Sequence, residues 1–96
     1  MIAEIQCLPS PAGTRQSAYA HIEAAIAAVV SSDLTYEVGP LGTSVEGAPD
    51  EVWAVLRAAH EATLASGAGS TVTVIKVFSD GTQAGPSMAD LVAGYR

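Results

Sequence analysis

The first residues of the chain alternate between apolar and polar side chains, as a β-strand does. Between Ile2 and Leu8 the odd-numbered residues are apolar, and Glu4 and Gln6 alternate with them, which is typical of a strand with one buried face. Pro9 and a second proline two residues later favour an end to this strand. We therefore expect a first strand over residues 2–8 and a loop over residues 9–16.

The spacing then changes to that of a helix. Ser17 is a residue type that commonly caps a helix N-terminus. Apolar residues follow it at intervals of three and four, which predicts one buried stripe on a helix ending near Ser31: Ile22, Ala25, Ile26, Val29 and Val30.

Two short alternating segments, residues 34–38 and 43–46, are separated by too few residues for a crossover, so we expect an antiparallel pair. Pro49 suits the first turn of a second helix and Gly67 its end. Residues 71–78 are rich in β-branched side chains and predict a fourth strand. The inner stripe of the second helix is predicted to be Val52, Val55, Leu56, Ala59 and Thr63.

This order predicts a single α+β domain over residues 1–96, a ferredoxin-like βαββαβ sandwich with an antiparallel sheet and two helices on one face. Residues 1–78 form its core. Residues 79–96 form a tail that could add a short helix from Pro86 or Ser87. Because nothing in the core covers the second sheet face, we expect a homo-oligomer.

Composition excludes several classes of function. The net charge is -6 with four Lys and Arg among 96 residues, so nucleic acid and anionic membranes are poor partners. The longest apolar stretch, Ala24 to Val30, is too short to span a membrane. The single cysteine, Cys7, cannot form an internal disulfide, so a reducing cytoplasm is the expected location. No metal site or cofactor is expected.

Catalysis has no support in the sequence. Neither His21 nor His60 belongs to a local motif with a serine or cysteine nucleophile. Two other ferredoxin-like activities also fail, because the chain lacks the Cys-x-x-Cys of copper carriers and the phosphate-gripping loop of acylphosphatases.

The most specific signal is a spaced combination of motifs. Residues 42–47 read Gly-Thr-Ser-Val-Glu-Gly, residues 50–52 read Asp-Glu-Val, and residues 60–62 read His-Glu-Ala. This combination resembles the small thiamine-binding family, over roughly residues 1–78. The chain departs from the family at Asp33, where members usually have glycine, and at Tyr19, where they have a small hydroxyl residue.

The resemblance implies a subunit that forms dimers or tetramers through its sheets and binds thiamine or its pyrimidine precursor without transforming it. A permanently charged thiazolium suits an acidic chain. The ligand-binding residues that we expect on this basis are Glu4, Ser17, Tyr36, Gly42, Thr43, Ser44 and Glu46.

Simpler roles compete at several of these positions. Alternation along residues 43–46 places Ser44 and Glu46 on one face and Thr43 on the other. Glu4 could instead pair with Lys76 across the sheet, and Ser17 could be only a cap. Gly42 could serve a turn.

Two other functions stay open. One is a small dimeric enzyme with a histidine in a closed cavity between subunits. The other is a purely structural or regulatory oligomer, which would lack such a cavity.

Overall fold

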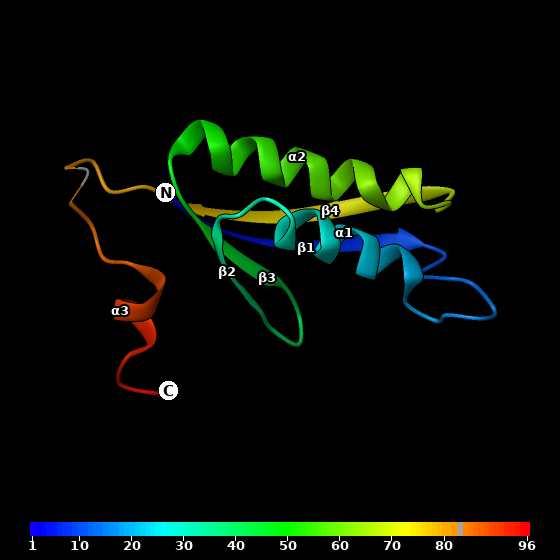
Figure 1. Cartoon of the computed structure of the whole chain (residues 1–96), viewed down its shortest axis with the longest axis horizontal. Helices are drawn as coiled ribbons and strands as arrows, with labels where there is room; N and C mark the ends of the chain where they lie inside the picture. Colours follow the sequence, from blue (N-terminus) through cyan, green and yellow to red (C-terminus); the bar gives the residue numbers. More distant parts are fainter. Residues whose placement is uncertain (83) are drawn as a thin grey trace.

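The computed structural model describes residues 1–82 and 84–96. Figure 1 shows the order of elements, which confirms the predicted βαββαβ arrangement with an added C-terminal helix. The elements are β1 (Ile2–Ser10), α1 (Ala20–Val30), β2 (Thr35–Val38), β3 (Thr43–Glu46), α2 (Pro49–Ala65), β4 (Ser70–Phe78) and α3 (Met88–Val92).

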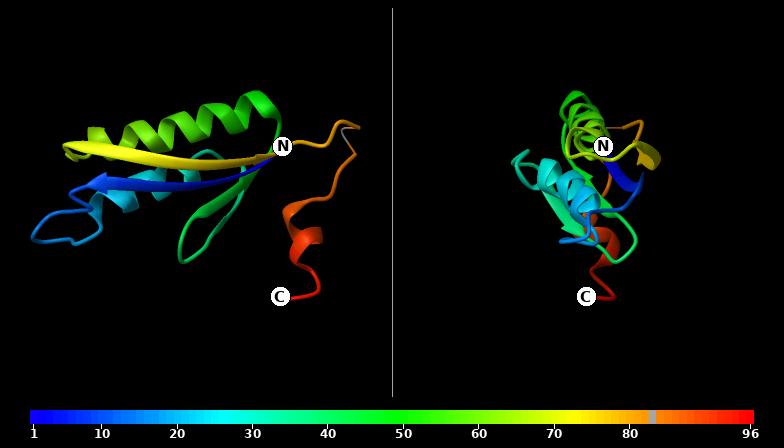
Figure 2. Two further views of the ribbon diagram at one scale, coloured as in Figure 1. Left: turned by 180° about the vertical axis from the view of Figure 1, so that it is seen from behind. Right: turned by 90° about the vertical axis from the view of Figure 1, so that its right-hand side faces the viewer.

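The four strands form one antiparallel sheet in the order β2-β3-β1-β4. Helices α1 and α2 cover one face, and α3 lies apart from them (Figure 1, Figure 2). The core between sheet and helices is apolar, and includes Ala3, Ile5, Cys7, Val29, Val45, Val52 and Leu56. We call the other side of the sheet the open face. It carries Ile2, Glu4, Gln6, Leu8, Ser44, Glu46, Val72, Val74, Lys76 and Phe78.

Strand β1 continues through Pro9, so the predicted end at Leu8 is wrong. Met1 and Gly47 exchange two backbone hydrogen bonds of 2.9 and 3.1 Å. Odd-numbered residues of β1 therefore point their backbone nitrogen and oxygen toward β3. The pairing with β3 stops at Ile5, so the missing N–H of Pro9 faces a side without a neighbouring strand. Proline is tolerated in such an edge position.

Ser17 does not cap the first helix, which corrects the prediction. Helix α1 begins at Ala20, and Tyr19 occupies the N-cap position without a side-chain bond. The carbonyl of Ser17 instead accepts hydrogen bonds from the N–H groups of Thr14 (2.8 Å) and Ala20 (3.3 Å). These bonds hold residues 17–19 in a turn, so they do not form the first turn of the helix that the sequence predicted after Ser17.

The buried stripe of α1 is also shifted from the prediction. His21, Ala25 and Val29 are buried, whereas Val30 is 43% exposed. The Nδ1 atom of His21 lies 2.7 Å from Oγ of Ser66, which supplies the partner that a buried imidazole needs. The stripe of α2 is confirmed, since all five residues predicted to be buried are buried.

Asp33 adopts a left-handed backbone conformation, with φ of 64°. Glycine has no side-chain penalty there, and aspartate tolerates this region better than most residues do. The left-handed backbone in this turn between α1 and β2 thus explains why members of the family that the chain resembles usually have glycine at this position.

We predict that Asp33→Gly stabilises the fold by ~0.5–1 kcal/mol, because relief of backbone strain exceeds the entropy that glycine adds to the unfolded chain. Urea denaturation measures the free energy of unfolding. Asp33→Asn is the matched control and should change it little. A glycine variant less stable than the wild type would contradict this account of the turn.

Candidate functional site

Two hollows lie on either side of the loop Gly39–Gly42, which joins β2 to β3. The first, which we call the apolar hollow, has a volume of about 200 Å³ and lies between this loop, β1 and α1. The second, the acidic hollow, has a volume of about 380 Å³ and lies between the loop, the open face and α3. Both exist because β3 pairs with only the first part of β1, so the loop passes beside β1 without continuing the sheet.

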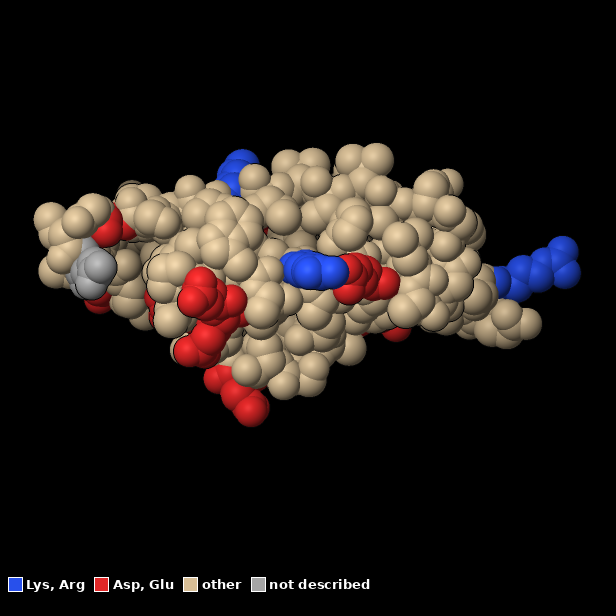
Figure 3. Space-filling view, turned by 90° about the horizontal axis from the view of Figure 1, so that it is seen from above, with Lys and Arg blue, Asp and Glu red and all other residues tan. Residues whose placement is uncertain are grey.

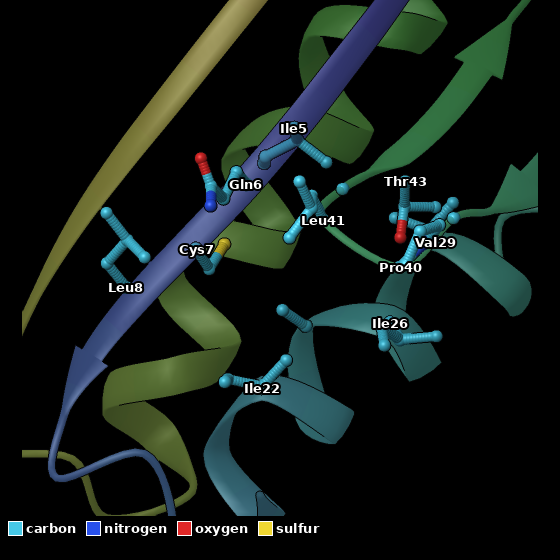
Figure 4. Close-up of a pocket in the computed structure, with 13 residues that line it drawn as sticks. Ile5, Gln6, Cys7, Leu8, Ile22, Ile26, Val29, Pro40, Leu41 and Thr43 are labelled. Atoms are coloured by element: carbon cyan, nitrogen blue, oxygen red, sulfur yellow. The ribbon is translucent and has the colours of Figure 1, made fainter.

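The apolar hollow is walled mainly by aliphatic side chains. Ile22 and Ile26 of α1 face Ile5 and Leu41 across it, as Figure 4 shows. Cys7 also lines this hollow, from β1. Burial raises the pKa of its thiol, and a weak hydrogen bond donated by the Thr73 hydroxyl lowers the pKa by a smaller amount. A buried thiol of this kind is a poor nucleophile at neutral pH.

The acidic hollow is built on one row of residues across the sheet. Glu37 of β2 is opposite Ser44 of β3, Ser44 is opposite Glu4 of β1, and Glu4 is opposite Lys76 of β4. Directly opposed side chains on one face lie close enough to contact the same small molecule. Glu4, Glu37 and Ser44 all line the hollow.

The predicted pairing of Glu4 with Lys76 is confirmed, although the contact is long. Lys76 Nζ lies 3.9 Å from Glu4 Oε1, and the two side chains are 81% and 49% exposed. An ion pair this exposed contributes little to stability. It therefore leaves the Glu4 carboxylate available to a ligand.

Glu46 lies in the next row of the open face, opposite Ile2. Its Oε2 atom accepts a 2.8 Å hydrogen bond from the backbone N–H of Met88, the first residue of α3. The shared face of Ser44 and Glu46 is as predicted, but Glu46 contacts the C-terminal helix at the border of the acidic hollow.

The other predicted site residues are divided between several places. Gly42 lines both hollows, and Thr43, on the helix side of the sheet, lines the apolar hollow. Tyr36 is opposite Val45 on the helix side of the edge strand and lines neither hollow. Ser17 lies in the loop before α1, also outside both. The seven residues therefore do not form one site.

Gly42 is needed for close packing and not for a special backbone angle. A Cβ atom at this position would lie 3.2 Å from both Glu4 Cγ and the Ile5 carbonyl oxygen. The loop thus passes directly against β1, between the two hollows. This favours the close-approach role for Gly42 over the role in a turn alone.

Sequence reasoning missed Glu37 and Arg96, which both line the acidic hollow and form an ion pair with each other. Alternation along β2 could have placed Glu37 on the open face with Ser44. The position of Arg96 has no signal in the sequence, because it depends on how the tail packs.

The histidines have structural partners away from the hollows. His21 is bonded to Ser66, and His60 Nδ1 lies 2.6 Å from the Thr73 hydroxyl. Neither lines the two hollows. Over residues 1–82 and 84–96, we find no group of three or more side chains suited to a metal ion. Within those same ranges, no helix is both long and apolar enough to cross a membrane.

The antiparallel sheet with two helices on one face defines a ferredoxin-like α+β domain. The sequence profile of the thiamine-binding protein family matches residues 3–96, and the chain belongs to this family. A UPF0045 protein of Clostridium perfringens is 29% identical over 92 residues, which cover 96% of this chain and 93% of that protein.

Two solved structures are similar over almost the whole chain. A Bacillus cereus structure of the domain of unknown function DUF77 is 27% identical with a TM-score of 0.81, and the match covers 99% of this chain and 90% of that one. A Thermotoga maritima protein, described provisionally as a thiamine biosynthesis/salvage protein, is 24% identical with a TM-score of 0.81 and coverages of 99% and 97%. They bear out the ferredoxin-like fold.

Proposed function

We propose that the protein binds thiamine or a related hydroxymethylpyrimidine compound, without transforming it, as a carrier, buffer or sensor. The acidic hollow is the proposed site. The observation that carries this proposal is the row of Glu37, Ser44 and Glu4 along its floor, in a chain whose family is named for thiamine binding.

The volumes of the two hollows favour the acidic one. Sites for small molecules usually measure about 300–1,000 Å³. The acidic hollow, at about 380 Å³, falls in this range, and the apolar hollow, at about 200 Å³, does not. A ligand with two rings therefore has room on the open face.

The chemistry of the floor also suits this ligand. Carboxylates attract the positive thiazolium, and they accept hydrogen bonds from the amino group of an aminopyrimidine. The Ser44 hydroxyl can donate to a ring nitrogen. Glu46 can join this set if its bond to Met88 opens.

Binding without catalysis is favoured over the enzymatic alternative. An enzyme of the dimeric ferredoxin-like type would need a histidine at its cavity, and both histidines bond to side chains elsewhere. The Cys7 thiol, with its raised pKa, faces the other hollow.

Calorimetric titration with thiamine tests the site. We expect Ser44→Ala and Glu4→Gln each to weaken binding roughly two- to tenfold, since the first removes a hydroxyl donor and the second removes the negative charge of a partly exposed acceptor. Glu23→Gln, on the exposed side of α1, is the charge-matched control and should bind as the wild type does. Equal binding by all four proteins would reject these residues. A wild type that binds neither thiamine nor its pyrimidine half at millimolar concentration would instead favour a structural or regulatory oligomer.

We further propose that copies of the chain assemble through the open face. Leu8, Val72 and Val74 are neighbours there and are 47%, 63% and 46% exposed. Apolar side chains grouped on a sheet face are typical of an interface between subunits. Dimers and tetramers are both compatible with such a surface.

Light scattering should therefore give at least twice the mass of one chain. Val72→Glu places a charge in the open face and should shift the protein toward the monomer. Leu64→Glu, at an exposed position of α2, makes the same chemical change outside the proposed interface and should keep the wild-type mass. A monomeric wild type at micromolar concentration would contradict the assembly.

A further inference from the structure

The carboxylates of the acidic hollow and its border all have partners within the chain itself. Glu4 pairs with Lys76, Glu37 pairs with Arg96, and Glu46 accepts the N–H of Met88. Two of these three partners come from residues 88–96, which we call the C-terminal segment. The segment therefore contacts the same groups that the proposed function assigns to a ligand.

The C-terminal segment forms the outer wall of the hollow. Met88 is buried, with 8% of its surface exposed, and it anchors the start of α3 beside β3. Leu91 and Val92 line the hollow from α3, and Arg96 lies at the end of the chain with its guanidinium group against Glu37. Figure 2 shows that α3 is separate from the two-helix layer, so its attachment depends on contacts of this kind.

We propose that the C-terminal segment competes with the ligand for Glu37. In the free protein Arg96 is the positive partner of this carboxylate, and in the complex the positive ring of the ligand takes the place of Arg96. This inference rests on the proposed function and adds its regulation. A guanidinium and a thiazolium have the same charge, so both cannot be close to one carboxylate without repulsion. Binding of the cationic ligand thus requires Arg96 to leave.

The ion pair is weak enough to be displaced. The Arg96 and Glu37 side chains are 56% and 42% exposed, and exposed pairs of this kind change an equilibrium by about two- to fivefold. The segment therefore tunes the affinity for a cation and does not block the hollow completely. A ligand without a charge gains nothing from the departure of Arg96.

The test is a titration of four proteins with two probes, thiamine and its hydroxymethylpyrimidine half, which lacks the thiazolium. Arg96→Gln should bind thiamine about two- to fivefold more tightly than the wild type. Glu37→Gln should bind it more weakly, and in the double variant the gain from Arg96→Gln should disappear. Arg96→Gln should leave binding of the uncharged pyrimidine half unchanged, because that probe has no positive ring to compete with the guanidinium group.

Arg57→Gln is the matched control. Arg57 forms an exposed ion pair of 2.9 Å with Glu61 on α2, on the helix side of the molecule. Figure 3 shows a basic side chain beside an acidic one on this side. Its loss should leave thiamine binding unchanged.

Hydrogen exchange of residues 88–96 gives a second readout. Thiamine should speed exchange of these amides in the wild type, and Arg96→Gln should speed it without ligand. If thiamine binds but Arg96→Gln binds it equally and exchange is unchanged, the competition is wrong and the proposed function stands. If neither the wild type nor Arg96→Gln binds either probe, the proposed function and this inference both fail.

Discussion

The short length of β3, which begins only opposite Ile5, is the constraint on which the rest of the structure depends. β1 pairs with β4 over its whole length but with β3 only as far as Ile5. The chain must therefore turn beside the middle of β1, and Gly42 permits the close approach. A hollow results on each side of this turn, apolar toward the helices and acidic toward the open face. A longer β3 would complete the sheet and leave neither.

Strand alternation explains how the motif at residues 42–47 contributes side chains both to the core under the helices and to the open face. Within residues 43–46, Thr43 and Val45 are buried against the helices, while Ser44 and Glu46 are on the open face. Conversely, Glu37, Ser44 and Glu4 come from three different strands and yet lie in one row. The ligand site that we propose is thus a property of strand register and not of the motif alone.

Much of the fold was predictable because local periodicity determines it. The stripe of α2 and the shared face of Ser44 and Glu46 follow from spacing alone, and both are as predicted. The errors arose where a distant partner decides the outcome. The buried His21 has its hydrogen-bond partner in the distant Ser66, and Pro9 is tolerated because β3 does not extend beside it. Neither of these long-range features can be predicted from the spacing of apolar residues.

The candidate site was less predictable than the fold for the same reason. Alternation could place Glu4, Glu37 and Ser44 on one face, but their position in one row depends on the register between strands, which the sequence does not specify. Arg96 needed the packing of a tail more than 50 residues away from Glu37. Contacts of long sequence separation, made by exposed side chains, leave no periodic signal.

The most direct test of this account is a thiamine titration of the isotope-labelled protein followed by amide chemical shifts. If the ligand lies in the acidic hollow, the largest changes should fall on Glu4, Glu37, Ser44 and residues 88–96. Changes confined to Cys7, Thr43 and the Ile22 side of α1 would place the ligand in the apolar hollow and contradict the account.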